Sequence, residues 1–202
     1  MARPAIAGVV LAAGESSRMG RPKALLEIEG TTFIHRIIAI HRAAKIERVI
    51  VVLGAHEAEI RDALTNEHVE IIVNARWREG RLGSLIAGIT AAEEKLVDAI
   101  VMHPVDHPCV KASTIVALCD AFANTGAKIV RPVYQSKHGH PVLFASDTFV
   151  ELRAASPEQG AREVVHRHAG DCVDVAVDDD GVMMNIDTPE QYEHLRGHLP
   201  GH

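Results

Sequence analysis

Three basic side chains near the amino terminus have the types and spacing needed to bind phosphate groups. Arg18, Arg21 and Lys23 lie within six residues, although the chain as a whole carries a net charge of −6. They follow an apolar run, residues 6–11, and lie among small residues that include two glycines and two serines. Glycine backbone can approach a ligand closely, and backbone N–H groups and hydroxyls can surround an anion. The stretch therefore predicts a loop that holds a polyphosphate.

Two well-known phosphate-binding loops do not fit this stretch. A Walker A loop has four residues between its two glycines and then Lys-Ser or Lys-Thr, whereas here five residues separate Gly14 from Gly20 and Arg21 follows. The dinucleotide fingerprint Gly-x-Gly-x-x-Gly is also absent from the sequence, which counts against a nicotinamide or flavin enzyme. Taken alone, the stretch also fits a glycine-rich loop with solvated charges.

Two aspartates farther along the chain could hold a metal ion. Asp106 follows the apolar run 98–102 and lies between two prolines, and Asp187 directly precedes a helix start at Thr188. Mg²⁺ prefers one or two carboxylates together with waters and phosphate oxygens. Each aspartate alone also fits a turn or a helix cap. The acidic run 178–180 is expected to be a solvated turn.

The cysteines and histidines do not predict a metal cluster. Cys109, Cys119 and Cys172 are odd in number and widely spaced, which indicates free thiols in a reducing compartment, so we expect the protein in the cytoplasm. His103 and His107 are four residues apart, but prolines break any helix that would align them. We expect them at the surface or in loops rather than as metal ligands.

Apolar runs and amphipathic segments alternate along the chain. Besides the first run, strands are expected near 48–53, 69–73, 98–102, 127–133, 141–144 and 172–177. Helices are expected after Thr32 and near 56–64, 84–96, 112–123, 148–153, 161–168 and from Pro189 onward, with a loop at 77–84. This alternation predicts one α/β domain, with a parallel sheet covered on both faces. Ligands of such sheets bind beyond the carboxyl ends of the strands.

The composition excludes several other classes of function. A net charge of −6 over 202 residues argues against nucleic-acid binding. No apolar run approaches the roughly 20 residues that span a bilayer, and we see no signal-peptide layout. Neither a nucleic-acid partner nor a membrane partner is expected.

The stretch from Leu11 to Lys23, taken as a whole, resembles a known signature. It matches Leu-Ala-Ala-Gly-x-Ser-x-Arg-Met-Gly-x-Pro-Lys of the nucleotidyltransferases with a Rossmann-like domain, and it is most similar to their molybdenum cofactor cytidylyltransferase group. Four further segments resemble motifs of this group and follow in the same order. They are Asn74-x-x-Trp77-x-x-Gly80-x-x-x-Ser84, Val105-Asp106-His107-Pro108, His138-Gly139-His140-Pro141 and Asn185-Ile186-Asp187-Thr188-Pro189-Glu190. The resemblance implies a single-domain Rossmann-like three-layer α/β/α sandwich with a mostly parallel sheet over residues 1–202.

The resemblance also implies roles for individual residues. The residues implied for nucleotide binding are Leu11, Ala12, Ala13, Gly14, Ser16, Ser17, Arg18, Lys23, Asn74, Gly80 and Ser84. Arg18, Lys23 and Asp106 would be catalytic, and Asp106 and Asp187 would bind Mg²⁺. The acceptor would lie against His138, His140 and Pro141.

The activity implied is Mg²⁺-dependent transfer of a nucleotide monophosphate to a phosphorylated acceptor, with release of pyrophosphate. Ala13 is typical of the cytidylyl group, whereas guanylyl relatives tend to have Leu-Ala-Gly-Gly, so CTP is the expected donor. Molybdopterin is the expected acceptor, and an apo-molybdoenzyme is a further partner. However, residues 157–162 read Pro-Glu-Gln-Gly-Ala-Arg where the group often has Gly-Asp-x-Gly-Ala-Arg. Two alternatives therefore stay open. The acceptor could be a sugar phosphate or an isoprenoid phosphate, or the protein could be a non-catalytic chaperone that delivers molybdenum cofactor to a hydroxylase.

Overall fold

The strand that precedes the basic loop lies inside the central sheet. A computed structural model describes residues 3–198, and in it β1 (Ile6–Ala12) is buried from Ala7 to Ala12. Its neighbours are β4 (Val49–Leu53) and β6 (Ala99–Pro104), and both pair with it in parallel. Continuous burial explains why these strands read as unbroken apolar runs rather than alternating ones.

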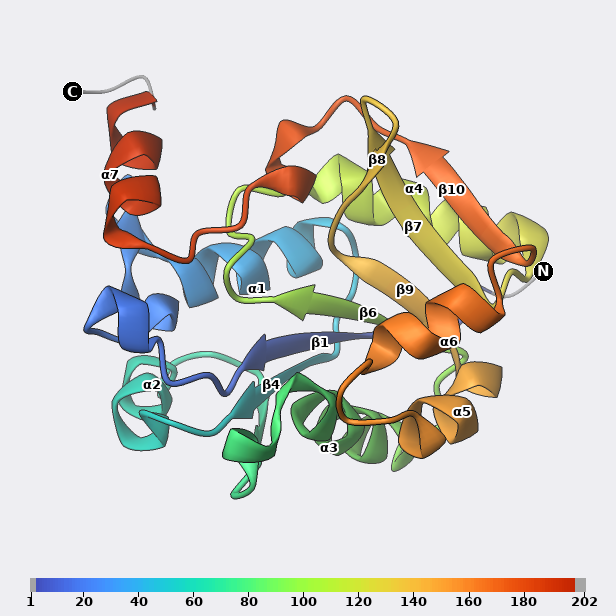
Figure 1. Cartoon of the computed structure of the whole chain (residues 1–202), viewed down its shortest axis with the longest axis horizontal. Coiled ribbons are helices and arrows are strands. Elements are labelled where there is room, and N and C mark those ends of the chain that lie inside the picture. The colour runs from blue at the N-terminus through green and yellow to red at the C-terminus, as the bar shows by residue number, and fades with distance from the viewer. Residues whose placement is uncertain (1–2, 199–202) are drawn as a thin grey trace.

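The sheet is mostly parallel (Figure 1). Its order among the described residues is β10-β7-β9-β6-β1-β4-β5, with β8 paired to β7. The remaining bounds are β5 (Glu70–Val73), β7 (Ile129–Tyr134), β8 (Lys137–His138), β9 (Val142–Ala145) and β10 (Cys172–Ala176). The strands β8 and β9 pair antiparallel with their neighbours. A small ribbon of β2 (Glu27–Ile28) and β3 (Thr31–Thr32) lies outside the sheet.

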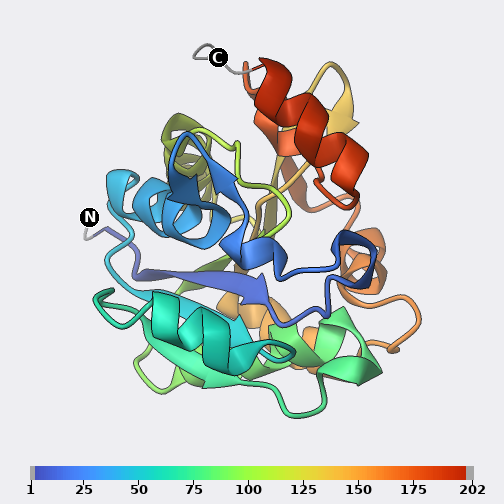
Figure 2. The ribbon, with the colours of Figure 1, turned by 90° about the vertical axis from the view of Figure 1, so that its left-hand side faces the viewer.

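Helices cover both faces of the sheet. One face packs against α3 (Arg81–Glu93), α5 (Phe149–Ala154) and α6 (Ala161–Arg167), and the other against α1 (Phe33–Ala43), α2 (Glu57–Ala63) and α4 (Ala112–Thr125). Figure 2 shows α1 and α3 on opposite sides of β1. The expected three-layer α/β/α sandwich with a mostly parallel sheet is therefore confirmed.

Local sequence explains where α1 begins. The Thr32 hydroxyl accepts a hydrogen bond from the His35 backbone at 3.4 Å, as an N-cap should. The side chains of Ile34, Ile37 and Ile38, spaced for one helical face, are fully buried. The last helix, α7 (Pro189–His198), packs on the β2–β3 ribbon through Tyr192 and Leu195.

Three local expectations are wrong. The segment 77–84 is not one loop, because Gly80, at φ 114°, ends a short 3₁₀ turn and α3 begins at Arg81. The strand β6 is longer than residues 98–102 and includes His103. The acidic run 178–180 is not solvated throughout, since Asp179 is 1% exposed and its carboxylate accepts hydrogen bonds from the Lys111 backbone, Thr114 and the Gly181 backbone.

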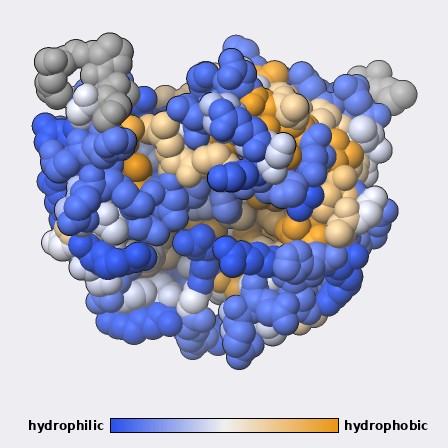
Figure 3. Space-filling view, turned by 45° about the horizontal axis from the view of Figure 1, so that its top comes forward, coloured by the Kyte–Doolittle hydropathy of each residue, from blue (hydrophilic) through white to orange (hydrophobic). Residues whose placement is uncertain are grey.

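The surface is mostly hydrophilic. In the face that Figure 3 shows, a hollow crosses the middle, and apolar side chains gather at the upper right, where β7 and β10 lie. In the part of the chain that the structure describes, no helix is long and apolar enough to cross a membrane.

Candidate active site

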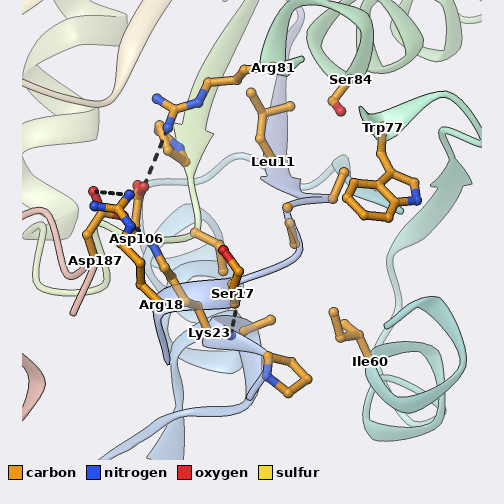
Figure 4. Close-up of a pocket in the computed structure, with 18 of the residues that line it drawn as sticks. Leu11, Ser17, Arg18, Lys23, Ile60, Trp77, Arg81, Ser84, Asp106 and Asp187 are labelled. Carbon is orange, nitrogen blue, oxygen red and sulfur yellow. Dashed lines mark hydrogen bonds and ion pairs between the residues drawn. The ribbon is translucent and has the colours of Figure 1, made fainter. Parts of the chain in front are cut away.

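A pocket of about 260 Å³ opens at the carboxyl ends of β1 and β6. It is lined by the basic loop, the start of α3, the end of β6 and Asp187 (Figure 4). All but one of the residues expected to bind the nucleotide line it, namely Leu11, Ala12, Ala13, Gly14, Ser16, Ser17, Arg18, Lys23, Gly80 and Ser84. The position of the pocket is the one expected for ligands of a parallel sheet.

Backbone hydrogen bonds bring the separate segments of the pocket together. The Val105 N–H donates to the Leu11 carbonyl at 3.1 Å, and the Ile186 N–H donates to the Asp106 carbonyl at 2.9 Å. The segment that carries Asp187 is thus bonded to the segment that carries Asp106. After β4, the Ala55 N–H donates to the Ala13 carbonyl at 3.0 Å. These bonds fix the four segments relative to one another.

The basic loop folds back on itself. Ser16 adopts a left-handed conformation, with φ 56°, and its hydroxyl accepts a hydrogen bond from the Lys23 backbone at 3.1 Å. The Met19 N–H donates to the Ser16 carbonyl at 2.8 Å, and the Met19 side chain is buried against the β2–β3 ribbon and α7. The fold of the loop thus places the Lys23 side chain in the pocket.

The cations of the pocket pair with its two aspartates. Lys23 Nζ bonds to Asp187 Oδ1, and Arg18 lies 3.6 Å from Asp187 Oδ2. Arg81 lies 3.7 Å from Asp106 Oδ2, as Figure 4 shows. The side chains of Arg18 and Arg81 are 68% and 63% exposed, whereas that of Lys23 is 12% exposed. Three positive charges therefore lie around two carboxylates.

Asp106 is ionised at neutral pH although it is buried. Burial by itself raises the pKa of a carboxyl group. The hydrogen bond from His107 Nδ1, at 2.8 Å, and the positive charges of Arg81 and Lys23 outweigh burial and lower the pKa of Asp106 to about 2. The pocket therefore contains a permanent negative charge beside its cations.

Asn74 is the expected nucleotide-binding residue that does not line the pocket. Its side-chain nitrogen donates to the Ser84 hydroxyl at 3.0 Å, and its side-chain oxygen accepts from the Arg76 backbone. Asn74 thus positions Ser84, which lines the pocket, without lining the pocket itself. A Cβ at Gly54 would lie 2.6 Å from both the Ala13 carbonyl oxygen and the Trp77 Cβ, so this glycine allows both segments to reach the pocket wall.

The residues expected to bind the acceptor do not line this pocket. His138 is exposed on β8 and lies 2.9 Å from an oxygen of Asp174. His140 is nearer to Asp106: its ring centroid lies 4.8 Å from that of His107, which bonds to Asp106. Burial, together with the nearby His107, lowers the pKa of His140 to about 4. Pro141 is buried and follows a cis peptide bond.

Sequence reasoning missed several residues of the site. Arg81 and Ile60 line the pocket, and the position of Arg81 directly after the glycine that starts α3 was the signal that could have identified it. Trp77, which was named from the sequence only as part of a motif, lines the pocket too. The expectation that His103 and His107 lie at the surface or in loops is wrong for His103, which is a fully buried strand residue. His107 is in a loop but is 5% exposed.

The carboxylates fit a divalent ion that also binds phosphate. Among residues 3–198, no group of three or more His, Cys, Asp and Glu side chains could hold a metal ion by itself. Asp106 and Asp187 line the same pocket as Lys23 and Arg18. Two carboxylates completed by phosphate oxygens and water are a donor set typical of Mg²⁺ in phosphoryl-transfer sites.

Comparisons with known proteins agree with this geometry. The family model described as the MobA-like NTP transferase domain matches residues 8–172. The nicotine blue oxidoreductase of Paenarthrobacter nicotinovorans is 29% identical over 95% of this chain and 97% of its own length. A 2-C-methyl-D-erythritol 4-phosphate cytidylyltransferase of Thermobifida fusca (strain YX) is 30% identical over 83% and 73%. A probable molybdenum cofactor guanylyltransferase of Bacillus cereus (strain Q1) is 26% identical over 92% and 93%.

Solved structures are similar over nearly the whole chain. Rv0371c from Mycobacterium tuberculosis H37Rv superposes with a TM-score of 0.82 at 27% identity, covering 97% of this chain and 100% of that one. A second structure of Rv0371c, in complex with manganese, has a TM-score of 0.78 at 26% identity and covers 96% and 99%.

Proposed function

Because the chain belongs to the MobA-like NTP transferase family and is a nucleotidyltransferase, we propose that it transfers a nucleotide monophosphate to a phosphorylated acceptor at the pocket described above. The observation that carries the proposal is the meeting of Lys23 and Arg18 with Asp106 and Asp187 in one pocket. Nucleotidyl transfer needs positioning and neutralisation of charge more than it needs a covalent intermediate. The pocket supplies both.

We propose CTP as the donor and a molybdopterin-type cofactor as the acceptor. Ala13 in the Leu-Ala-Ala-Gly stretch supports CTP, and one relative is named a cytidylyltransferase. Another relative is named for guanylyl transfer in molybdenum cofactor synthesis, which supports the class of acceptor. The acceptor would lie beside His140 and Pro141, with His138 two residues before His140 on β8; the 4.8 Å between the ring centroids of His140 and His107, the neighbour of Asp106, supports this position. An apo-molybdoenzyme would receive the product.

The basic loop would bind the triphosphate. Backbone N–H groups from Ala13 to Ser17 would face the phosphates, and Arg18 and Lys23 would move from Asp187 to phosphate oxygens. Asp106 and Asp187 would then hold Mg²⁺, which neutralises phosphate charge and orients the reacting groups when it is bound. The low pKa of Asp106, about 2, keeps that carboxylate ionised at every pH near neutrality.

The transfer itself needs no general base. A phosphate oxygen of the acceptor attacks the α-phosphorus of CTP, a new P–O bond forms, and the bond to the β-phosphate oxygen breaks to release pyrophosphate. An acceptor phosphate has a second pKa of about 6 and is largely ionised at pH 7. Lys23 would stabilise the charge that develops on the phosphates during this step.

We also propose that residues 1–202 act as one domain in the cytoplasm. Cys109, Cys119 and Cys172 are free thiols, which supports a reducing compartment.

Release of pyrophosphate tests the proposal directly. CTP, GTP, ATP and UTP would each be incubated with Mg²⁺ and with molybdopterin or a sugar phosphate. We expect release with CTP and molybdopterin. Release with another pair would correct the donor or the acceptor, and no release with any pair would contradict the enzymatic function. An apo-hydroxylase that co-purifies without turnover would then favour the delivery chaperone.

A further inference from the structure

Three buried histidines form a hydrogen-bonded series that ends at Asp106. We call His41, His103 and His107 the histidine network. His41 lies on α1, His103 on β6 and His107 in the loop after β6. The first two are fully buried, and His107 is 5% exposed. His41 Nε2 lies 3.2 Å from His103 Nδ1. His103 Nε2 lies 2.9 Å from the His107 carbonyl oxygen, and His107 Nδ1 lies 2.8 Å from Asp106 Oδ1. The network therefore connects a helix on one face of the sheet to a carboxylate in the pocket.

The positions of the hydrogens follow from the partners. A carbonyl oxygen and a carboxylate oxygen only accept, so His103 Nε2 and His107 Nδ1 carry hydrogens. Burial holds the pKa of His103 well below its usual value and lowers the pKa of His41 to about 4, so both rings are neutral near pH 7. A neutral ring with its hydrogen on Nε2 accepts at Nδ1, and His103 therefore accepts from His41. The donors run in one direction, from α1 toward Asp106.

The His41 ring, at the end of the network farthest from Asp106, packs against Gly8 of β1. His41 Nδ1 is buried and has no hydrogen-bond partner. Because the hydrogen of the His41 ring is on Nε2, Nδ1 carries a lone pair and is an unpaired acceptor rather than an unpaired donor. Gly8 of β1 leaves the space for it, since a Cβ there would lie 2.6 Å from His41 Nδ1. A side chain at position 8 would displace the ring and, with it, the donor to His103.

We propose that the histidine network is a positioning device for Asp106, which fixes Oδ1 and leaves Oδ2 turned to the pocket for the divalent ion. The inference rests on the proposed function, because that function requires the ion. Oδ2 lies 3.7 Å from Arg81 at the pocket wall. Among the described residues, those lining the pocket include Asp106 and none of the three histidines. The His140 ring lies beside the His107 imidazole, with the two ring centroids 4.8 Å apart.

Substitution of His107 separates positioning from packing. His107→Leu removes the donor to Asp106, whereas His107→Asn keeps a side-chain N–H near the place of Nδ1. The measurement is the affinity of the protein for Mn²⁺ in the presence of CTP, by electron paramagnetic resonance, with thermal unfolding measured beside it. His107→Leu should weaken Mn²⁺ binding by about 10- to 100-fold, the range for groups that orient metal ligands. His107→Asn should recover most of that affinity.

His168→Leu is the matched control. His168 is 8% exposed and lies 2.7 Å from a carboxylate oxygen of Glu151, at the end of α6 and outside the pocket. Its loss should lower stability and leave Mn²⁺ binding unchanged. If His107→Leu does not fold, His41→Leu tests the same network from α1 and should also weaken Mn²⁺ binding.

The outcomes separate this inference from the function on which it rests. Wild-type protein that binds no Mn²⁺ with CTP would overturn the proposed function. Wild-type protein that binds Mn²⁺, with His107→Leu and His41→Leu binding it equally well, would overturn the histidine network as a positioning device.

Discussion

Lys23 is the most enclosed cation of the pocket and the one most directly tied to a carboxylate. Its side chain is 12% exposed and bonds to Asp187, while Arg18, on the same carboxylate, is 68% exposed. Removing a charged group from water costs free energy unless it is paired. Triphosphate oxygens can replace that partner without leaving the charge unpaired. The ion pair thus holds the Lys23 side chain in the pocket, where we propose that a phosphate binds.

Lys23→Ala should lower turnover by at least about 100-fold, because it removes a charge that stabilises the transition state. The measurement is the rate of pyrophosphate release at saturating CTP and Mg²⁺. The matched control is Lys95→Ala, since Lys95 is exposed in a separate hollow at the other end of the strands. A rate for Lys23→Ala close to that of the control would reject the role of Lys23.

At this scale, the sequence identified most residues that line the pocket, including Asp106 and Asp187, but missed Arg81 and the burial of His103. The loop is contiguous, so its chemistry is visible in the order of its residues. Arg18 and Lys23 line the pocket, whereas Arg21 does not. Arg21 lies over the Tyr192 ring, 5.4 Å from its centroid. Arg81 reaches the pocket only because α3 begins beside it. His103 is buried against His41, which lies 62 residues earlier in the chain. No local pattern contains that information. Whether the predicted residues act as assigned stays a prediction.

The helix α7 positions Asp187. The Gln191 side-chain oxygen accepts hydrogen bonds from the backbones of Asp187 and Thr188, at 2.7 and 3.0 Å, and the Thr188 hydroxyl accepts from the Gln191 backbone at 3.4 Å. This reciprocal arrangement is a capping box and confirms the helix start expected at Thr188. The Tyr192 hydroxyl donates to the Glu27 carbonyl at 2.7 Å and fastens the helix to β2.

Leu195→Ala should loosen α7 and, through it, the site. Leu195 is 7% exposed and shares a cluster with Met19 of the basic loop. Its truncation should cost about 2–3 kcal/mol of stability. Hydrogen exchange should become faster in α7 and in residues 17–23, and pyrophosphate release should slow. Leu152→Ala, in the separate cluster under α5, is the control. If exchange in residues 17–23 rises equally in both variants, α7 does not support the loop.

Elements were easier to predict than their ends. Strands such as β1 and β4 are continuous apolar runs with little ambiguity. The start of α3 was missed because Gly83 and Ser84 read as loop residues, although Gly80 alone makes the turn. Helix starts marked by a capping side chain, at Thr32 and Thr188, were placed correctly.

Across the whole molecule, the buried histidines make stability depend on pH. Burial lowers the pKa of His41 and of His140 to about 4 and that of His103 well below its usual value. In the unfolded chain, histidine has a pKa of about 6.5. The stabilisation that comes from these groups is therefore complete above pH 6.5 and is lost as the pH falls toward 4, because the unfolded state binds more protons.

The free energy of unfolding should therefore fall between pH 6.5 and 5, by up to about 1.4 kcal/mol per pH unit for each such histidine. Denaturant titrations at several pH values measure this slope. His41→Leu should reduce the slope, and His166→Leu, at an exposed position, should not. A stability independent of pH over this range would show that these histidines bind protons equally in the folded and unfolded states, and that burial does not lower their pKa values.

The architecture was the most predictable property of the molecule. Alternation of apolar runs and amphipathic segments restricts the topology, since parallel strands require crossover helices. The antiparallel β9 between β6 and β7 was not expected from the short apolar run that forms it. Its direction depends on which neighbours it pairs with, and this is decided by the sheet as a whole.

The central claim is that the basic loop, Asp106 and Asp187 hold one divalent ion and one triphosphate together. Calorimetric titration of CTP into the protein, with Mg²⁺ or with a chelator, tests it most directly. We expect Mg²⁺ to tighten CTP binding by about tenfold or more, and we expect Asp106→Asn and Asp187→Asn each to remove that effect. CTP binding that is equally tight without Mg²⁺, or variants that keep the full effect of Mg²⁺, would contradict the account.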